Sequence, residues 1–146
     1  MVDSDLGVRN ETYGLFVELG RAPAPDEVAE RLDSGTADVV ASWRRLHDAH
    51  ALVLDDTGAI RMANPFSAVP TPHRVHTAGR SWYGNCAWDA FGICVVLQAD
   101  GRIETTCPDC RDTIVIGVRN GRPDDDSLLF HCLVPAGRWW DDIVFT

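Results

Sequence analysis

The sequence predicts an α+β fold, with three helices and a β-hairpin followed by a small mixed β-sheet domain that holds one buried helix. The order of the hydrophobic patterns supports this fold. Helical periodicity dominates residues 8–50, whereas short apolar runs separated by turn signals dominate the second half. We therefore expect a helical module over residues 1–63, an extended proline-rich connector over 64–80 and an α/β domain over 81–146.

The helical module is predicted from three periodic segments. Apolar residues recur at helical spacing over residues 8–20, where a glycine ends the first helix. Pro25 and the two acidic residues after it are typical of a first helical turn, so a second helix begins there. A third helix is expected over residues 36–50, and residues 52–62 have the pattern of a hairpin. This order of elements is winged-helix-like.

A winged-helix-like module suggests two roles, DNA binding or the packing and covering of a site. The third helix carries Arg44 and Arg45, which a DNA-binding helix could use. The chain nevertheless has 13 basic and 22 acidic residues, a net charge of −9, and its basic residues are all arginine. The hairpin tip is Asp55-Asp56, where a DNA-contacting wing needs positive charge. We therefore favour the packing role and disfavour nucleic acid as a partner.

The segment after the connector combines a cysteine and an aspartate with a long apolar run. Residues 82–97 end in a nearly continuous apolar run, which indicates a buried helix. Asn85 is a candidate cap, so that Cys86 falls in the first turn and its thiolate is favoured by the helix dipole. Asp89 lies three residues later, on the same helical face. The pair is either a reactive sulfur with a proton carrier, or a capping carboxylate beside a packed thiol.

The remaining segments predict strands at residues 101–106, 113–118 and 128–134, with a tight turn at Cys107-Pro108-Asp109-Cys110 and another turn at Asn120-Gly121. Two cysteines at this spacing form half of a zinc site, which His131 and Cys132 would have to complete. Adjacent strand residues point to opposite faces, which argues against that completion. A structural zinc on Cys107 and Cys110 stays open as one interpretation.

Composition limits the class of protein. The five cysteines are odd in number and all lie in the second half, so thiol chemistry or metal binding is favoured over a disulfide framework. We find no apolar run long enough to span a bilayer, and the acidic amino-terminal residues do not have the pattern of a secretory signal. We expect a cytoplasmic protein that has no membrane partner.

Three segments together resemble the alkylmercury lyase (organomercurial lyase) family. They are NPFSAVPTPHRV, NCAWDAFGI and GRIETTCPDC, and the most specific element is Cys86-Ala87-Trp88-Asp89, which is similar to the family's Cys-Ala-x-Asp motif. The helical module also resembles that of the family, so the similarity extends over roughly residues 8–145.

The resemblance implies cleavage of a carbon–mercury bond by protonolysis, without an organic cofactor. In the family two cysteines hold the mercury of the substrate, and a carboxylate carries a thiol proton to the departing carbon. Cys86 would be the first thiol, Asp89 the proton carrier, and Cys107 would match a structural cysteine. The implied partners are a small organometallic substrate and the cytosolic thiols that remove Hg(II).

The resemblance leaves the second thiol open. The family's second reactive cysteine corresponds best to a position just after Thr146, and Cys132 is the substitute within the sequence. A thiol-based protein that binds or senses a metal or metalloid without turnover is the alternative, as is the same scaffold with another reaction of Cys86 and Asp89.

Overall fold

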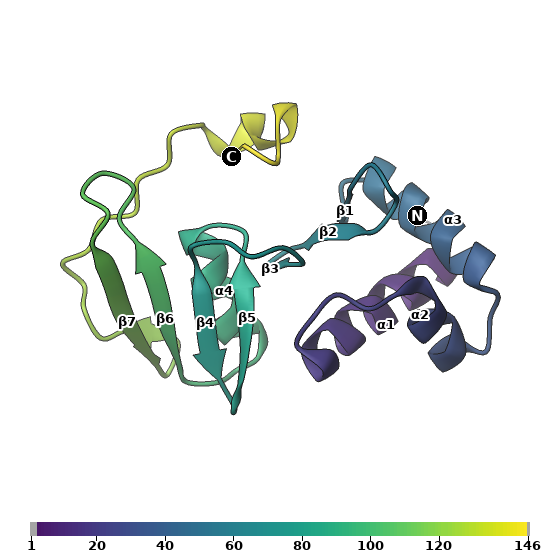
Figure 1. Ribbon diagram of the computed structural model, residues 1–146, viewed down its shortest axis with the longest axis horizontal. Helices are drawn as coiled ribbons and strands as arrows, with labels where there is room; N and C mark the ends of the chain where they lie inside the picture. Colours follow the sequence, from purple (N-terminus) through teal and green to yellow (C-terminus); the bar gives the residue numbers. More distant parts are fainter. Residues whose placement is uncertain (1–2, 146) are drawn as a thin grey trace.

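The structure, a computed structural model, describes residues 3–145 of the chain. Its first part contains the three predicted helices, α1 (Asp3–Leu19), α2 (Pro25–Leu32) and α3 (Thr36–Asp48), which lie together at one end of the molecule (Figure 1). Helix α1 begins five residues before the periodic segment from which it was predicted. Within the described residues, no helix has both the length and the apolar character needed to cross a membrane.

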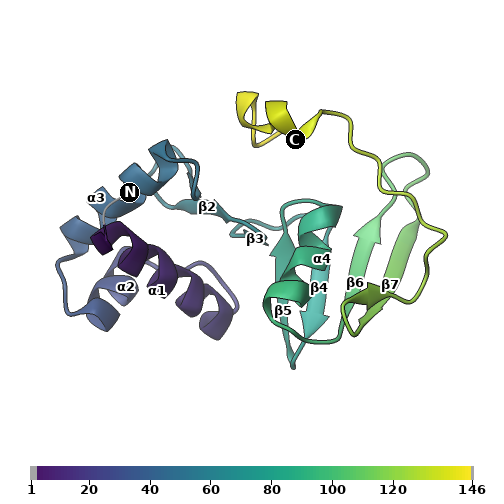
Figure 2. The same ribbon diagram turned by 180° about the vertical axis from the view of Figure 1, so that it is seen from behind.

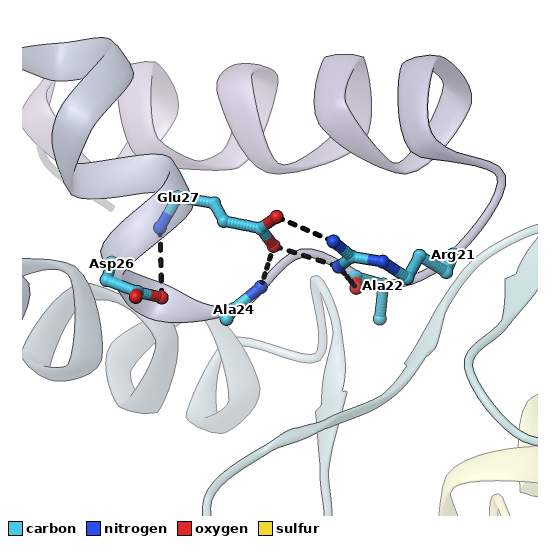
Figure 3. A network of polar contacts seen from close by, with 5 residues as sticks. All are labelled: Arg21, Ala22, Ala24, Asp26 and Glu27. Atoms are coloured by element: carbon cyan, nitrogen blue, oxygen red, sulfur yellow. Dashed lines mark hydrogen bonds and ion pairs between the residues drawn. The ribbon is translucent and has the colours of Figure 1, made fainter.

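The connection from α1 to α2 is fixed by a polar network around Glu27 (Figure 3). The Glu27 carboxylate accepts hydrogen bonds from the backbone amide of Ala24 at 2.7 Å and from the guanidinium of Arg21 at 2.9 and 2.6 Å. The amide bond reaches back over the first turn, as in a capping box. Pro25 at the first helical position adds a fixed φ angle, so the sequence signals that predicted this helix also hold its start in place.

One arginine that could have served DNA binding is used inside the helical module. Asp5 of α1 is buried, with a side chain only 2% exposed, and accepts hydrogen bonds from Arg45 at 2.6 Å and from Ser42 at 2.7 Å. The guanidinium of Arg45 therefore ties α3 to α1. This contact supports the packing role that we favoured for the module.

The second part is built on one eight-stranded sheet with the order β1-β2-β3-β5-β4-β6-β7-β8. The predicted α+β class is confirmed, although each strand pairing among the described residues is antiparallel, so the sheet is not mixed. The strands are β1 (Val53–Leu54), β2 (Ile60–Ala63), β3 (Phe66–Ser67), β4 (Arg74–Thr77), β5 (Arg80–Gly84), β6 (Gly101–Thr106), β7 (Thr113–Arg119) and β8 (Arg122–Pro123).

The proline-rich segment 64–80 is more than a connector. It is extended as predicted, but it supplies β3 and β4, and β4 lies between β5 and β6 inside the sheet. Val75 and Thr77 of β4 are buried. A strand of four residues shows too short a pattern to be recognised, and its stability comes from the two neighbours that pair with it.

Helix α4 (Ala87–Val96) forms where a buried helix was predicted, and it covers one face of the sheet over β4 and β5 (Figure 2). Only one side of it is buried, because Val95 and Val96 of the apolar run are 61% and 56% exposed. Ala90, Ile93 and Cys94 point into the core. The core is continuous with the helical module, because Phe16 of α1 stacks on Phe66 with ring centroids 5.2 Å apart. The indole nitrogen of Trp82 in β5 also donates to the carbonyl of Phe16 at 3.2 Å.

The carboxy-terminal segment differs from the prediction. Residues 128–134 form no strand in the structure, and most of their side chains are exposed, including Leu129 at 95%. The turn predicted at Asn120-Gly121 is present, with positive φ angles of 50° and 72°, but it leads only into the two-residue strand β8. A short 3₁₀ helix, η1 (Ala136–Asp141), follows, and Trp140 in it stacks on His50 of the helical module. The sequence of residues 128–134 is typical of a strand, but they stay irregular because no neighbouring strand among the described residues pairs with them.

Candidate functional site

The candidate site lies where β5 passes into α4. Strand β5 ends at Gly84, and Cys86 is the N-cap residue of the helix, with extended backbone angles of φ −142° and ψ 179°. Sequence reasoning had given the cap to Asn85, so the cap moves by one residue. A Cβ on Gly84 would come within 2.8 Å of the Ala90 amide nitrogen, so glycine is required for the helix to start this close to the strand. This tight junction fixes the position of Cys86.

Asp89 faces Cys86 from the first turn of α4. Both side chains are partly buried, and the thiol of Cys86 donates a hydrogen bond that favours the charged form of the carboxylate. The side-chain amide of Asn85 donates to Asp89 at 3.1 Å and to the side-chain oxygen of Asn64 at 2.9 Å. The structure thus places the sulfur and the acid together and surrounds the acid with donors.

The pKa of the Cys86 thiol is shifted in the direction opposite to the one expected for a residue at a helix start. Burial raises the pKa above its ordinary value. The backbone amides of Asp89 and Trp88 favour the thiolate, but the negative charge of Asp89 and its acceptance of the thiol proton act against them. The environment of the sulfur therefore favours the thiol, whereas the helix start by itself favours the thiolate.

The pKa of Asp89 is also raised, first by burial, while the hydrogen bonds from Asn85 and Cys86 lower it. A buried carboxyl group of this kind accepts a proton more readily than an exposed aspartate does. The pair can thus exchange one proton over a single hydrogen bond, which is what a proton carrier beside a sulfur ligand needs.

Tyr13 of α1 feels the charge of the site. Burial raises the pKa of Tyr13, and the charge of Asp89 raises it further, so the phenol lies within electrostatic range of the acid. The phenol donates to the carbonyl of Ala51 at 3.3 Å, and Arg9 lies over its ring. The sequence marked Tyr13 only as an apolar position, because nothing in its spacing relates it to a residue 76 positions away.

Cys132 lies on the exposed carboxy-terminal segment. Its thiol donates to the carbonyl of Val134 at 2.9 Å. Two residues earlier, the ring of Phe130 lies 6.0 Å from that of Trp88 in the first turn of α4. The segment that carries Cys132, the candidate second thiol, therefore passes over the start of the helix that carries the first.

Cys107 and Cys110 occupy the tight turn between β6 and β7, as predicted. Among residues 3–145 no group of three or more histidine, cysteine or carboxylate side chains is arranged to hold a metal ion. His131 and Cys132 therefore do not join this pair, and the described residues provide two of the four ligands that a structural zinc needs.

Two surface hollows lie away from this chemistry. One is lined by His76, Thr77, Gly79, Arg80 and Ser81, the other mainly by β6 and β7, and neither includes Cys86 or Asp89. The site is therefore identified from side-chain contacts and partial exposure rather than from a deep cavity.

Comparison with known proteins shows which family and which fold the chain is similar to. The alkylmercury lyase family matches residues 66–146, which include β3 to β8, α4 and all five cysteines. A crystal structure described as the mercury-bound form of MerB2 has a TM-score of 0.67 and 22% sequence identity to this chain. The match covers 86% of this chain and 60% of that one, so the chain spans less than two thirds of its length. No curated protein matches the chain.

The family match contains the Cys86–Asp89 pair, the Cys107–Cys110 turn and the sheet that holds both. The chain belongs to the alkylmercury lyase family.

Proposed function

We propose that the protein cleaves the carbon–mercury bond of small organomercurials, with Cys86 as the sulfur ligand and Asp89 as the proton carrier. The observation that carries this proposal is the contact between the two side chains at the start of α4. Membership of the alkylmercury lyase family supports the reaction type.

The first step is exchange of the substrate's thiol ligand. The sulfur of Cys86 forms a bond to the mercury of R–Hg–SR′, the Hg–SR′ bond breaks, and the thiol proton of Cys86 passes to Asp89. The released thiolate takes a proton from solvent. The raised pKa of Asp89 suits it to keep the proton that it receives.

In the second step the proton moves from Asp89 to the carbon. The carbon–mercury bond breaks, its electron pair forms the new C–H bond, and R–H leaves. Mercury(II) remains on the sulfur of Cys86 with a second thiolate as its other ligand. Cys132 or a thiol from solution provides that ligand, and cytosolic thiols then remove the metal ion.

Asn85 is a positioning residue in this scheme. Its amide holds one oxygen of Asp89 while it is itself held by Asn64. Because this donor favours the charged carboxylate, it also limits how far burial raises the pKa of the acid.

The test measures hydrocarbon release. Methylmercury or phenylmercury is incubated with the protein and excess monothiol, and methane or benzene is quantified by gas chromatography. We expect release from the wild type, none above background from Cys86→Ser, and a rate lowered roughly 100-fold or more in Asp89→Asn. Cys110→Ser, a thiol substitution outside the site, is the matched control and keeps the wild-type rate. Equal release from the wild type and Cys86→Ser would rule out the lyase proposal.

A second candidate is mercury binding without cleavage. It is favoured by one observation, that Cys132, the candidate second thiol, lies on an exposed segment and donates its thiol proton to the carbonyl of Val134. It predicts tight binding of Hg(II) through Cys86, no hydrocarbon from the wild type, and nearly unchanged binding in Asp89→Ala. The same assay, combined with a mercury titration, separates the two functions.

A further inference from the structure

The turn at residues 107–112 holds two thiols in a fixed arrangement outside the Cys86 site. It is closed by hydrogen bonds from the Cys107 amide to the Asp112 carbonyl at 2.9 Å and from the Arg111 amide to the Cys107 carbonyl at 3.0 Å. Arg111 has a positive φ angle of 66°, which turns the chain back into β7. Both cysteines are reduced and neither is fully buried.

The backbone of this turn is directed at the sulfur atoms. The amides of Cys110 and Asp109 donate to the sulfur of Cys107, as does the Cys110 thiol, and together they lower the pKa of Cys107. The amide of Asp112 donates to the sulfur of Cys110, while hydrogen bonds of the Cys110 thiol to the Asp112 side chain and to Cys107 act against it, and the pKa of Cys110 is raised. The hydrogen bonds of the turn therefore fix the positions of two sulfur atoms, the soft ligands that cysteine offers to a metal ion. The two sulfur atoms lie within hydrogen-bonding reach of each other, so one ion can contact both.

We propose that Cys107 and Cys110 form a second, independent binding site for a soft cation that prefers two thiolate ligands, such as Hg(II). On binding, two S–H bonds are replaced by two S–Hg bonds and two protons pass to solvent, so no oxidant or reductant is needed. Soft thiolates select soft cations. Zinc requires four ligands, and residues 3–145 offer this pair no third one.

The turn at residues 107–112 lies at the same end of the sheet as Cys86. Strands β5 and β6 are both antiparallel to β4, and Arg74 of β4 is paired with Tyr83 on one side and Glu104 on the other. The two strands therefore run in the same direction, and their carboxyl ends lie at the same end of the sheet (Figure 1). Cys86 follows β5 and Cys107 follows β6, so the second site lies at the same end of the sheet as the first.

The experiment is a mercury titration of reduced protein in the presence of a competing monothiol, glutathione. The starting variant is Cys86→Ser, which removes the first site. Binding is followed by the ultraviolet sulfur-to-mercury charge-transfer band, and stoichiometry by native mass spectrometry. We expect one Hg(II) per chain in Cys86→Ser.

Two exposed thiols give a matched comparison in this background. Adding Cys110→Ser removes one ligand of the chelate, so the affinity falls at least about 100-fold, because the second thiol no longer acts at a high effective concentration. Adding Cys132→Ser instead leaves affinity and stoichiometry unchanged. Cys110 is exposed and its thiol is not part of the core, so a far-ultraviolet circular dichroism spectrum is expected to show that Cys110→Ser is folded.

Three results would overturn the proposal. They are an unaltered affinity in Cys86→Ser/Cys110→Ser, no bound Hg(II) in Cys86→Ser, and a zinc ion that co-purifies through Cys110 with the spectrum of a four-coordinate site after cobalt substitution. The lyase proposal is judged separately, since hydrocarbon release is measured with Cys86 intact and does not depend on Cys110.

Discussion

The balance at Cys86 shows how a single residue's environment can reverse an expectation drawn from its position. A helix start favours a thiolate, and the amides of Asp89 and Trp88 do so here. Burial of the sulfur and the charge of Asp89 outweigh them, so the pKa of the thiol is raised. A thiol that stays protonated beside a carboxylate can supply the proton that the proposed reaction needs.

Replacing Asp89 with asparagine should shift the reactivity of Cys86 to lower pH. Both the charge of Asp89 and its acceptance of the thiol proton raise the pKa of Cys86, and Asp89→Asn removes the charge while the backbone amides remain. The pH dependence of iodoacetamide labelling at Cys86, followed by peptide mass spectrometry, checks this. Cys132, labelled in the same sample, serves as the internal control. An unchanged or higher midpoint for Cys86 would show that the carboxylate does not hold the thiol proton.

The buried carboxylate of Asp5 makes Arg45 more important than its surface position suggests. Arg45→Ala would leave a charge that is 2% exposed without its guanidinium, and we expect a clear fall in the free energy of unfolding. Arg44→Ala, at the exposed neighbouring position, should change it by less than about 0.5 kcal/mol. Urea denaturation of the two variants tests the difference, and equal losses would contradict the structural role given to Arg45.

At the scale of elements, the junction of β5 and α4 is the part on which the site depends most. Gly84 permits the helix to start against the strand, because a side chain there would meet backbone atoms of Ala90 and Cys86 that cannot move independently. The start of α4 in turn holds Cys86 and Asp89 in contact. Packing at this junction and chemistry at the site are therefore coupled.

A methyl group at position 84 should disturb both the packing of the β5–α4 junction and the chemistry of the Cys86 site. We expect Gly84→Ala to lower the free energy of unfolding by about 2 kcal/mol, because overpacking against backbone cannot be relieved by a rotamer change. It should also reduce hydrocarbon release, because the start of α4 is displaced.

Gly14→Ala is the control for this substitution. Gly14 lies inside α1 with nothing within 4 Å of the added methyl group, so alanine should stabilise the protein by about 0.5–1 kcal/mol. Thermal unfolding of both variants gives the comparison. Two variants of equal stability would show that the β5–α4 junction is looser than the structure indicates.

At the scale of the whole molecule, the helical module and the sheet share one core. The buried cluster runs from Val8 and Phe16 of α1 through Phe66 and Trp82 to Val118 of β7. Arg80 of β5 donates to the carbonyl of Val17, and Trp82 to that of Phe16. The module therefore packs on the sheet instead of standing apart from it.

This continuity predicts a single cooperative unfolding transition. Calorimetric and van't Hoff enthalpies should agree, and Arg45→Ala in the module and Gly84→Ala in the sheet should each shift the same transition. Differential scanning calorimetry of the wild type and both variants checks this. Two resolved transitions, with each variant moving only one, would mean that the two parts unfold separately.

The sequence by itself determined those features that depend on local patterns. Helical periodicity and first-turn residues located α1 to α3, and a continuous apolar run located α4. Asn120-Gly121 marked its turn, and the spacing of Cys86 and Asp89 placed them on one helical face. The Cys107–Cys110 turn could also be predicted, because proline and a short polar segment between two strands favour a tight turn.

Tertiary structure decided the features that depend on neighbours distant in sequence. β4 is a strand because β5 and β6 pair with it, whereas residues 128–134 have no strand beside them and stay irregular. The raised pKa of Cys86 comes from the residues that bury it. The hydrogen bond of Asn85 to Asn64 and the electrostatic effect of Asp89 on Tyr13 connect segments that are far apart in the sequence. Hydrogen-bond pairing and desolvation are properties of an environment, and a one-dimensional pattern does not contain the environment that folding creates.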